Sequence, residues 1–130
     1  MLVIIPTAGI GSRLDLHTKH FNKSMIQLGD LPVISRIIES YPANAKFIII
    51  LGYKGDQIEE FLSLIYPKKK IKFVYVKNYD GKGSGLTLSL KASIKFINQP
   101  FFFHANDSIF TDKNFYKKIN KDTMFLSKGK

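Results

Sequence analysis

The sequence predicts an α/β fold in which a mostly parallel sheet lies between two layers of helices. Apolar runs of strand length occur at Leu2–Ile5, Phe47–Leu51 and Phe101–Ala105. Segments with apolar residues at helical spacing separate these runs, and strands that alternate with helices are typical of parallel sheets. The 130 residues suffice for one domain at most, and the 45% hydrophobic content is enough for a packed core.

The first strand is predicted at Leu2–Ile5. The segment Pro6–Lys23 after it is long for a connection, which favours a functional loop. A helix is predicted from about Leu31, with Pro32 in its first turn and Pro42 at its end. The apolar face of this helix consists of Val33, Ile34, Ile37, Ile38 and Tyr41.

The middle of the chain predicts a strand, a helix and a second strand. The uninterrupted run Phe47–Leu51 predicts a strand that is covered on both faces. Asp56, followed three residues later by Glu59, marks a helix start. The apolar face of that helix consists of Ile58, Phe61, Leu62 and Ile65. The alternating segment Ile71–Val76 predicts a strand with one wetter face, as at a sheet edge.

The C-terminal part predicts three further elements around the strand Phe101–Ala105. A helix is predicted to begin near Gly85, although alternation within Leu86–Leu90 also fits a strand. A short helix is predicted at Thr111–Ile119 and a last strand at Asp122–Ser127. The helical spacing of the first of these segments rests on Leu86, Leu90, Ile94 and Ile97.

Composition limits the class of protein. The chain has no cysteine, which excludes disulfides and thiolate metal sites. No apolar run reaches the roughly 18 residues of a membrane span, and the N-terminus lacks a basic leader, so a cytoplasmic location without membrane contact is expected.

The net charge of +10 is unevenly distributed. By count, Met1–Ile65 is neutral, whereas Tyr66–Lys130 holds fourteen lysines and four acidic residues. One interpretation is attraction of a polyanion, and the other is a solvated lysine-rich surface. Arginine occurs only as Arg13 and Arg36, which disfavours nucleic acid as a partner because arginine carries most base readout.

The stretch Ile5–Lys23 has the residues of a phosphate site at the end of a strand. Glycines at Gly9 and Gly11 would allow backbone N–H groups to approach an anion closely. Arg13 can bind phosphate oxygens bidentately, and Lys23 adds a point charge.

Two common phosphate-binding motifs are excluded by spacing. A dinucleotide fingerprint needs a third glycine where Leu14 stands, and Gly81-Lys82-Gly83 does not supply a P-loop. A third pattern fits, and its elements are Gly9-Ile10-Gly11-Ser12-Arg13-Leu14, Thr18, Lys23 and Gln27–Ile34.

This pattern resembles the start of the nucleotidyltransferases, which make activated sugars and alcohols from a nucleoside triphosphate (NTP) and a phosphorylated acceptor. The resemblance extends to Asp107 and is strong over Met1–Pro32. Leu16 and Asn22 depart from the pattern, because the family usually has proline at both positions. The resemblance implies a Rossmann-like α/β/α fold, incomplete at the C-terminus because family domains are longer, so that residues 1–130 would be the nucleotide-binding part.

The implied reaction transfers NMP from an NTP to a sugar phosphate or a phosphorylated alcohol such as phosphocholine, with release of pyrophosphate. The resemblance implies that Arg13 and Lys23 are catalytic, and that Asp107, at the end of a strand, holds Mg²⁺. A turn or cap role is the alternative for Asp107. The resemblance also implies a set of nucleotide-binding residues, namely Ala8, Gly9, Gly11, Ser12, Asn78, Gly83 and Ser84.

The remaining candidate residues, which are histidines and phenylalanines, are predicted to have no role in catalysis or ligand binding. His17 and His20 lack a third metal ligand nearby and are predicted to be exposed. His104 is predicted to be a packed strand residue, and Phe101–Phe103 to be core. The hypotheses are therefore a nucleotidyltransferase, an NTP-binding domain without turnover, or a basic nucleic-acid-binding domain; a homo-oligomer is compatible with each.

Overall fold

A four-stranded parallel sheet forms the centre of the protein in the computed structural model, which describes residues 1–11, 19–81 and 85–126. The strand order is β5-β4-β1-β6. The strands are β1 (Leu2–Pro6), β4 (Lys46–Leu51), β5 (Lys70–Tyr75) and β6 (Phe101–Phe103). β5 lies at one edge, which confirms the predicted edge position of that strand.

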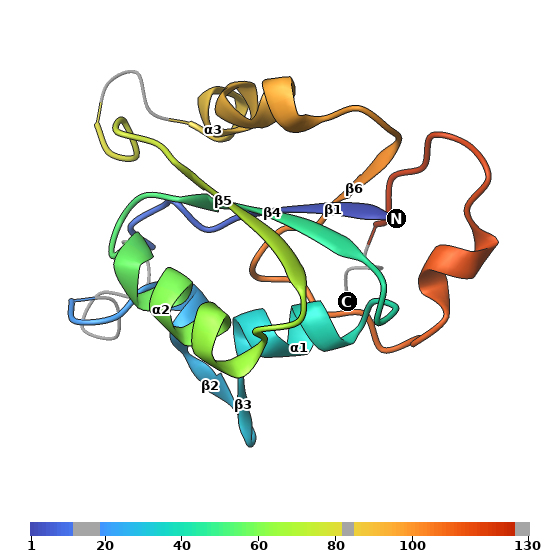
Figure 1. Ribbon diagram of the computed structural model, residues 1–130, viewed down its shortest axis with the longest axis horizontal. Coiled ribbons are helices and arrows are strands. Elements are labelled where there is room, and N and C mark those ends of the chain that lie inside the picture. The colour runs from blue at the N-terminus through green and yellow to red at the C-terminus, as the bar shows by residue number, and fades with distance from the viewer. Residues whose placement is uncertain (12–18, 82–84, 127–130) are drawn as a thin grey trace.

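Helices cover both faces of the sheet, so the predicted Rossmann-like three-layer fold is confirmed (Figure 1). α1 (Val33–Glu39) and α2 (Gly55–Ile65) lie on one face. α3 (Leu86–Ser93), continued by the 3₁₀ turn η3 (Ile94–Phe96), lies on the other. β1 pairs with both β4 and β6, so the chain reverses its winding beside β1, where the ends of β1 and β6 can form one site.

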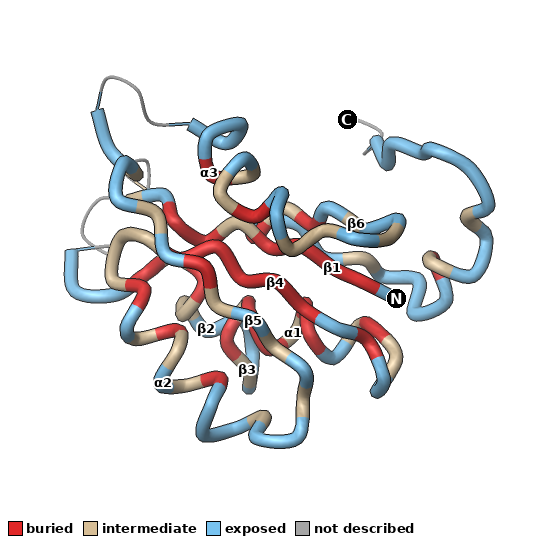
Figure 2. The backbone as a smooth tube through the Cα atoms, turned by 45° about the horizontal axis from the view of Figure 1, so that its top comes forward, coloured by how far each residue is buried: buried red, intermediate tan, exposed pale blue. Residues whose placement is uncertain are grey.

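The core lies on both sides of the two central strands (Figure 2). Alternate residues point to opposite faces of a strand, so Val3 and Ile5 pack with α1 and α2, whereas Leu2 and Ile4 pack on the α3 side. The uninterrupted apolar run of β4 is buried on both faces, as predicted. Among the described residues, no helix is long and apolar enough to span a membrane.

A small hairpin precedes α1, where the sequence predicted helix from about Leu31. β2 (Gln27–Leu28) and β3 (Leu31–Pro32) are antiparallel, and their turn contains Gly29 with a φ of 73°. The guanidinium of Arg36 binds Asp30 at 2.7 Å and also donates to the Leu28 carbonyl. These tertiary contacts override the helical pattern, so Pro32 caps α1 instead of lying in its first turn.

Two other predicted helices begin where the sequence placed them, near Asp56 and Gly85, but they differ in detail. Lys54 caps α2 with a left-handed φ of 48°, so Asp56 lies in the first turn rather than at the cap. α3 packs through Ser89 and Ser93, the buried residues of that helix, because small side chains allow close approach to the sheet. Of its predicted apolar positions, Leu90 and Ile97 pack against the core, whereas Leu86 (53%) and Ile94 (61%) are exposed.

The C-terminal part differs most from the prediction. β6 ends at Phe103, and Phe101 and Phe103 are exposed on the α3 side of this edge strand, so only Phe102 packs against the core as predicted. Only a 3₁₀ turn, η4 (Phe115–Lys118), forms within 111–119, because Asp112 accepts the Asn114 N–H and competes with the helix. Residues 122–126 are not in a strand, and residue 127 lies outside the described ranges.

Candidate functional site

A cavity of about 310 Å³ opens at the carboxyl ends of β1 and β6. It brings together four residues that the sequence singled out, namely Ala8, Gly9, Lys23 and Asp107. The rest of its lining comes from the same two strand ends and from the start of α3, and consists of Pro6, Tyr79, Gly85, Leu86, Ser89, Phe103, Ala105 and Asn106. This position is where ligands bind in open parallel sheets.

The loop after β1 is fixed against the end of β4. Both the backbone N–H and the hydroxyl of Thr7 donate to the carbonyl of Ile50 at 2.8 Å, and the Tyr53 N–H donates to the carbonyl of Ala8 at 2.9 Å. A Cβ on Gly52 would lie 2.8 Å from the Cβ of Ala8, so a glycine is needed there for this close approach. A Cβ on Gly9 would meet nothing within 4 Å, so packing does not require a glycine there, and the space beside its backbone is open.

Asn22 joins this loop to the segment that carries Lys23. Its side chain is fully buried, and its Nδ2 donates to the carbonyls of Thr7 (2.8 Å) and Tyr53 (2.7 Å). Its Oδ1 accepts the N–H of Ser24 at 2.9 Å, and its own N–H donates to Oε1 of Gln57 at 3.0 Å. These four bonds hold the one-turn 3₁₀ helix η2 (Lys23–Met25) in place.

A second buried contact connects η2 to the end of β6. Asn106 Nδ2 donates to the hydroxyl of Ser24 at 2.9 Å, which brings their sequence neighbours Asp107 and Lys23 close together. Lys23 Nζ lies 4.0 Å from Oδ2 of Asp107, and the Asp107 side chain is 69% exposed. An ion pair of this length and exposure contributes little to stability, so both charges are available to a ligand.

Oxygen donors at this cavity suit Mg²⁺ shared with a ligand. The exposed carboxylate of Asp107 lines the cavity beside the open backbone of Gly9. No group of three or more His, Cys, Asp or Glu side chains occurs within the part of the chain that the structure describes, so this part holds no all-protein metal cage. Mg²⁺ commonly binds one or two carboxylates together with phosphate and water, which this arrangement fits.

The remaining predicted site residues are not assembled at this cavity. Gly11 and Asn78 are described, but neither lines it. Ser12, Arg13, Gly83 and Ser84, as well as Leu16 and His17, lie outside the described residues.

Sequence reasoning missed Tyr79, Leu86, Ser89 and Phe103 as wall residues. Only their adjacency to the glycine-rich segment and to the end of the strand before Asp107 could have indicated them.

His104 is packed in the interior, as predicted, although it lies just after the end of β6 rather than in the strand. Its Nε2 lies 2.8 Å from the carbonyl of Ser108, so Nε2 carries the proton, and its Nδ1 accepts the hydroxyl of Tyr41 at 2.8 Å. Burial lowers the pKa of His104 below its ordinary value, against smaller opposing effects of Ser108 and Asp107. By contrast, the side chain of His20 is exposed, and its carbonyl accepts a hydrogen bond from Gln57.

The lowered pKa of His104 predicts loss of stability in mild acid. The folded state favours neutral imidazole, so the unfolded state takes up the proton first as the pH falls below about 6.5. We expect the unfolding free energy to be fully retained above that pH and to decline as the pH falls through the folded-state pKa. Urea unfolding at pH 7.5 and pH 5.5 measures this decline in unfolding free energy. If His104→Gln lost as much unfolding free energy between the two pH values as the wild type, the decline would come from other groups.

Comparison with known proteins gives relatives of one chemical class. No protein-family profile matches the sequence. A probable glucose-1-phosphate cytidylyltransferase of Bacillus subtilis is 30% identical over 104 residues, which are 77% of this chain and 35% of that protein. The glucose-1-phosphate cytidylyltransferase of Salmonella typhimurium is 34% identical over 65 residues, 48% of this chain and 25% of that protein. The matches thus span about a third or less of these relatives.

Solved structures with the same fold are also nucleotidyltransferases. CTP:phosphocholine cytidylyltransferase from Streptococcus pneumoniae matches with a TM-score of 0.76 at 23% identity, over 92% of this chain and 51% of that one. The inositol-1-phosphate CTP transferase from T. maritima matches with a TM-score of 0.70 at 19% identity, over 94% and 49% of the two chains. A UDP-glucose pyrophosphorylase matches with a TM-score of 0.65 at 22% identity, over 82% and 45%. The chain therefore has the fold of sugar-phosphate and phosphocholine-type nucleotidyltransferases over most of its length.

Proposed function

We propose that this chain, which has the nucleotidyltransferase fold, supplies the NTP site of an enzyme that transfers a nucleotidyl group to a phosphorylated small molecule. The observation that carries the proposal is the buried Asn22–Ser24–Asn106 network, which holds Lys23 and Asp107 together beside Gly9. The ends of β1 and β6 thus present open backbone and a carboxylate to one cavity, and η2 presents a cation to it. CTP is the proposed nucleotide, because the curated relatives are cytidylyltransferases.

In the proposed reaction, a phosphate oxygen of the acceptor attacks the α-phosphorus of CTP. The bond from the α-phosphorus to its bridging oxygen breaks, and pyrophosphate leaves with that electron pair. No protein nucleophile is needed, so the work of the site is to neutralise and align two anions that repel. Lys23 would stabilise charge at the α-phosphate, and Arg13, placed by the resemblance, would stabilise charge on pyrophosphate.

Asp107 would hold Mg²⁺ together with phosphate oxygens, and the bound cation would neutralise triphosphate charge. Asp107→Asn keeps the shape of the side chain and removes its charge. We expect the variant to lose the Mg²⁺-dependent part of its CTP affinity and to keep the metal-free part. Calorimetry with and without Mg²⁺ measures both, with Asp122→Asn, an exposed aspartate elsewhere, as the control. An unchanged response to Mg²⁺ would remove Asp107 from the metal site.

Gly9 gives a prediction that separates binding from folding. Its φ is not in the left-handed region, and an added Cβ meets no protein atom within 4 Å, so Gly9→Ala should fold with unchanged stability. The added methyl would occupy the space through which a phosphate approaches the backbone. We expect at least a tenfold weaker CTP affinity with the melting temperature unchanged. Equal CTP affinity would show that phosphate does not approach this backbone.

Turnover distinguishes the proposed enzyme from an NTP-binding domain without activity. Pyrophosphate release is measured with CTP, Mg²⁺ and either glucose 1-phosphate or phosphocholine as acceptor. Release that requires both an acceptor and Lys23 supports transfer, whereas CTP binding without release supports the binding domain. A thermal-shift panel of the NTPs beside a random oligonucleotide tests the third class: stabilisation by the oligonucleotide alone would overturn the proposal.

A further inference from the structure

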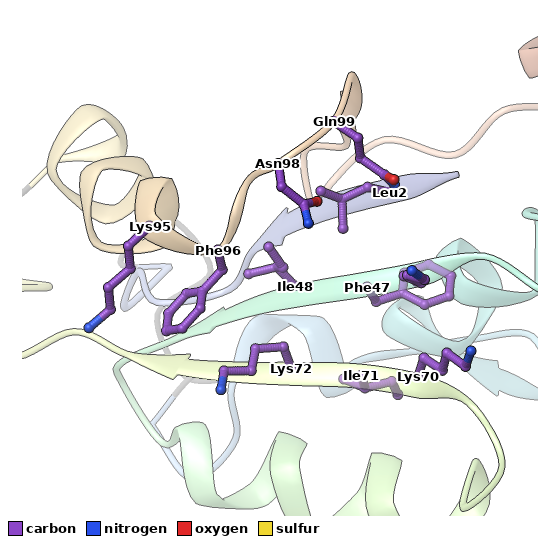
Figure 3. A pocket seen from close by; sticks show the side chains of 11 residues that line it. Leu2, Phe47, Ile48, Lys70, Ile71, Lys72, Lys95, Phe96, Asn98 and Gln99 are labelled. Atoms are coloured by element: carbon purple, nitrogen blue, oxygen red, sulfur yellow. The ribbon is translucent and has the colours of Figure 1, made fainter.

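A second hollow, of about 440 Å³, lies at the amino ends of the sheet strands (Figure 3), whereas the proposed CTP site lies at their carboxyl ends. Its walls come from the amino-terminal halves of β1, β4 and β5 and from the segment 95–99 that follows α3. We call it the amino-end hollow. Nothing in the proposed reaction uses it, because that reaction takes place at the carboxyl ends of β1 and β6.

The charge of the amino-end hollow is positive and uncompensated. Four exposed lysines line it, Lys46, Lys70, Lys72 and Lys95, and no carboxylate does. Lys46 and Lys70 are direct partners on neighbouring strands, and Lys72 follows two residues later on the same face. The ion pairs within the described ranges use other cations. Like charges opposite each other on a sheet destabilise it, and a bound anion would relieve that repulsion.

Apolar and amide groups complete the hollow. The floor holds Leu2 and Ile48, both buried, and the ring of Phe96 lies at the end of the hollow where Lys95 and Lys72 stand (Figure 3). The Nζ atoms of Lys72 and Lys95 lie 4.6 Å and 5.1 Å from the centroid of the Phe96 ring, so both ammonium groups lie beside the same ring.

The carboxamides of Asn98 and Gln99 lie near Leu2 on the opposite wall. They add neutral donors that a phosphate or a ring substituent can use. The hollow thus combines cations, neutral donors and an apolar surface, which is the composition of a small-molecule site rather than of a uniformly solvated charged face.

We propose that the amino-end hollow binds a small phosphate ester that carries an apolar ring, with its phosphate at Lys72 and Lys95 and its ring against Phe96. The volume is within the range of small-molecule sites, roughly 300–1,000 Å³. No arginine lines the hollow, so it lacks the side chain that most often reads nucleic-acid bases. This proposal is independent of the CTP site.

The test uses phenyl phosphate as the probe, with inorganic phosphate and phenol as its separate halves. The ¹⁵N-labelled Lys23→Gln variant is titrated with each probe in the absence of Mg²⁺, so that binding at the proposed CTP site contributes little to the observed shifts. We expect saturable shifts of the amide signals of residues 46–48, 70–72 and 95–99, and tighter binding of phenyl phosphate than of either half. The double variant Lys72→Gln/Lys95→Gln should bind about tenfold more weakly, the effect of losing two exposed charge contacts.

Controls separate a built site from a charged surface. The matched double variant Lys113→Gln/Lys121→Gln removes two exposed lysines elsewhere and should leave the affinity unchanged. Phe96→Leu should abolish the preference for phenyl phosphate over inorganic phosphate. Weak shifts spread over all lysines, or no saturation, would overturn the proposal, as would tighter binding of an oligonucleotide at the same residues. CTP affinity of the Lys72/Lys95 variant should equal that of the wild type, which keeps failure here separate from failure at the CTP site.

Discussion

Asn22→Ala should cost about 3 kcal/mol of unfolding free energy, because buried polar groups that lose their partners cost about 1–3 kcal/mol each. The substitution deprives the carbonyls of Thr7 and Tyr53 of a donor and the N–H of Ser24 of its acceptor. All three groups lie at the junction of the β1 loop, the β4 turn and η2. We expect the same variant to lose CTP affinity, since the position of Lys23 depends on this junction. Urea unfolding and calorimetry measure the two losses.

Matched variants test whether Asn22 acts through these bonds. Asn22→Asp retains an acceptor for Ser24 but directs a carboxylate at the carbonyls of Thr7 and Tyr53, so it should be no more stable than Asn22→Ala. Asn44→Ala removes an exposed asparagine and should stay within about 0.5 kcal/mol of the wild type. If Asn22→Ala lost no more stability than Asn44→Ala, the network would not be what holds the site together.

Lys23→Ala should weaken CTP binding by about 2 kcal/mol, or roughly thirtyfold, the usual range for a hydrogen bond to a charged group. Lys23 lines the cavity beside Gly9, and its only ion pair among the described residues is the long contact to the exposed carboxylate of Asp107. The fold therefore makes little use of its charge, and the melting temperature should hardly change. Cytidine, which lacks phosphate, should bind equally well to both proteins.

Lys19 supplies the control for Lys23. It is an exposed lysine a few residues earlier in the same segment, and within the described ranges its contact is made by its backbone carbonyl, which accepts the hydroxyl of Tyr53 at 3.3 Å. Lys19→Ala should keep wild-type CTP affinity. Equal effects of the two substitutions would mean that general positive charge, rather than the placed ammonium group, attracts the triphosphate. Lower affinity of Lys23→Ala for cytidine would point to a folding defect.

The strands were predictable because each has a strong local signal. The apolar runs that became β1 and β4 are buried on both faces, and alternation in β5 correctly indicated an edge. The hairpin before α1 was not predictable, because it depends on Arg36 reaching back to Asp30 and Leu28, contacts that no local pattern encodes. The exposed Phe101 and Phe103 show the same limit, since a run of aromatic residues does not reveal that α3 leaves part of the sheet uncovered.

For the site, spacing in the sequence singled out charged residues but not their supports. Lys23 and Asp107 were selected one by one, and the structure places them 4.0 Å apart. Asn22 was noticed only as a departure from the proline usual in the resembling family. Its side chain is buried and makes hydrogen bonds to residues 15 and 31 positions away in sequence. These hydrogen bonds fix the loop, whereas a proline would fix it by restricting the backbone dihedral angle φ. Long-range polar contacts of this kind become visible only in three dimensions.

The location of bound CTP tests the central claim most directly. Amide signals of the ¹⁵N-labelled wild-type protein are followed as CTP and Mg²⁺ are added. If the triphosphate binds at the carboxyl ends of β1 and β6, then Gly9, Lys23, Ser89 and Asp107 shift strongly and saturate together, while Lys46 stays unchanged. Saturable shifts centred on the amino ends of β4 and β5, with Gly9 and Lys23 unaffected, would contradict the account.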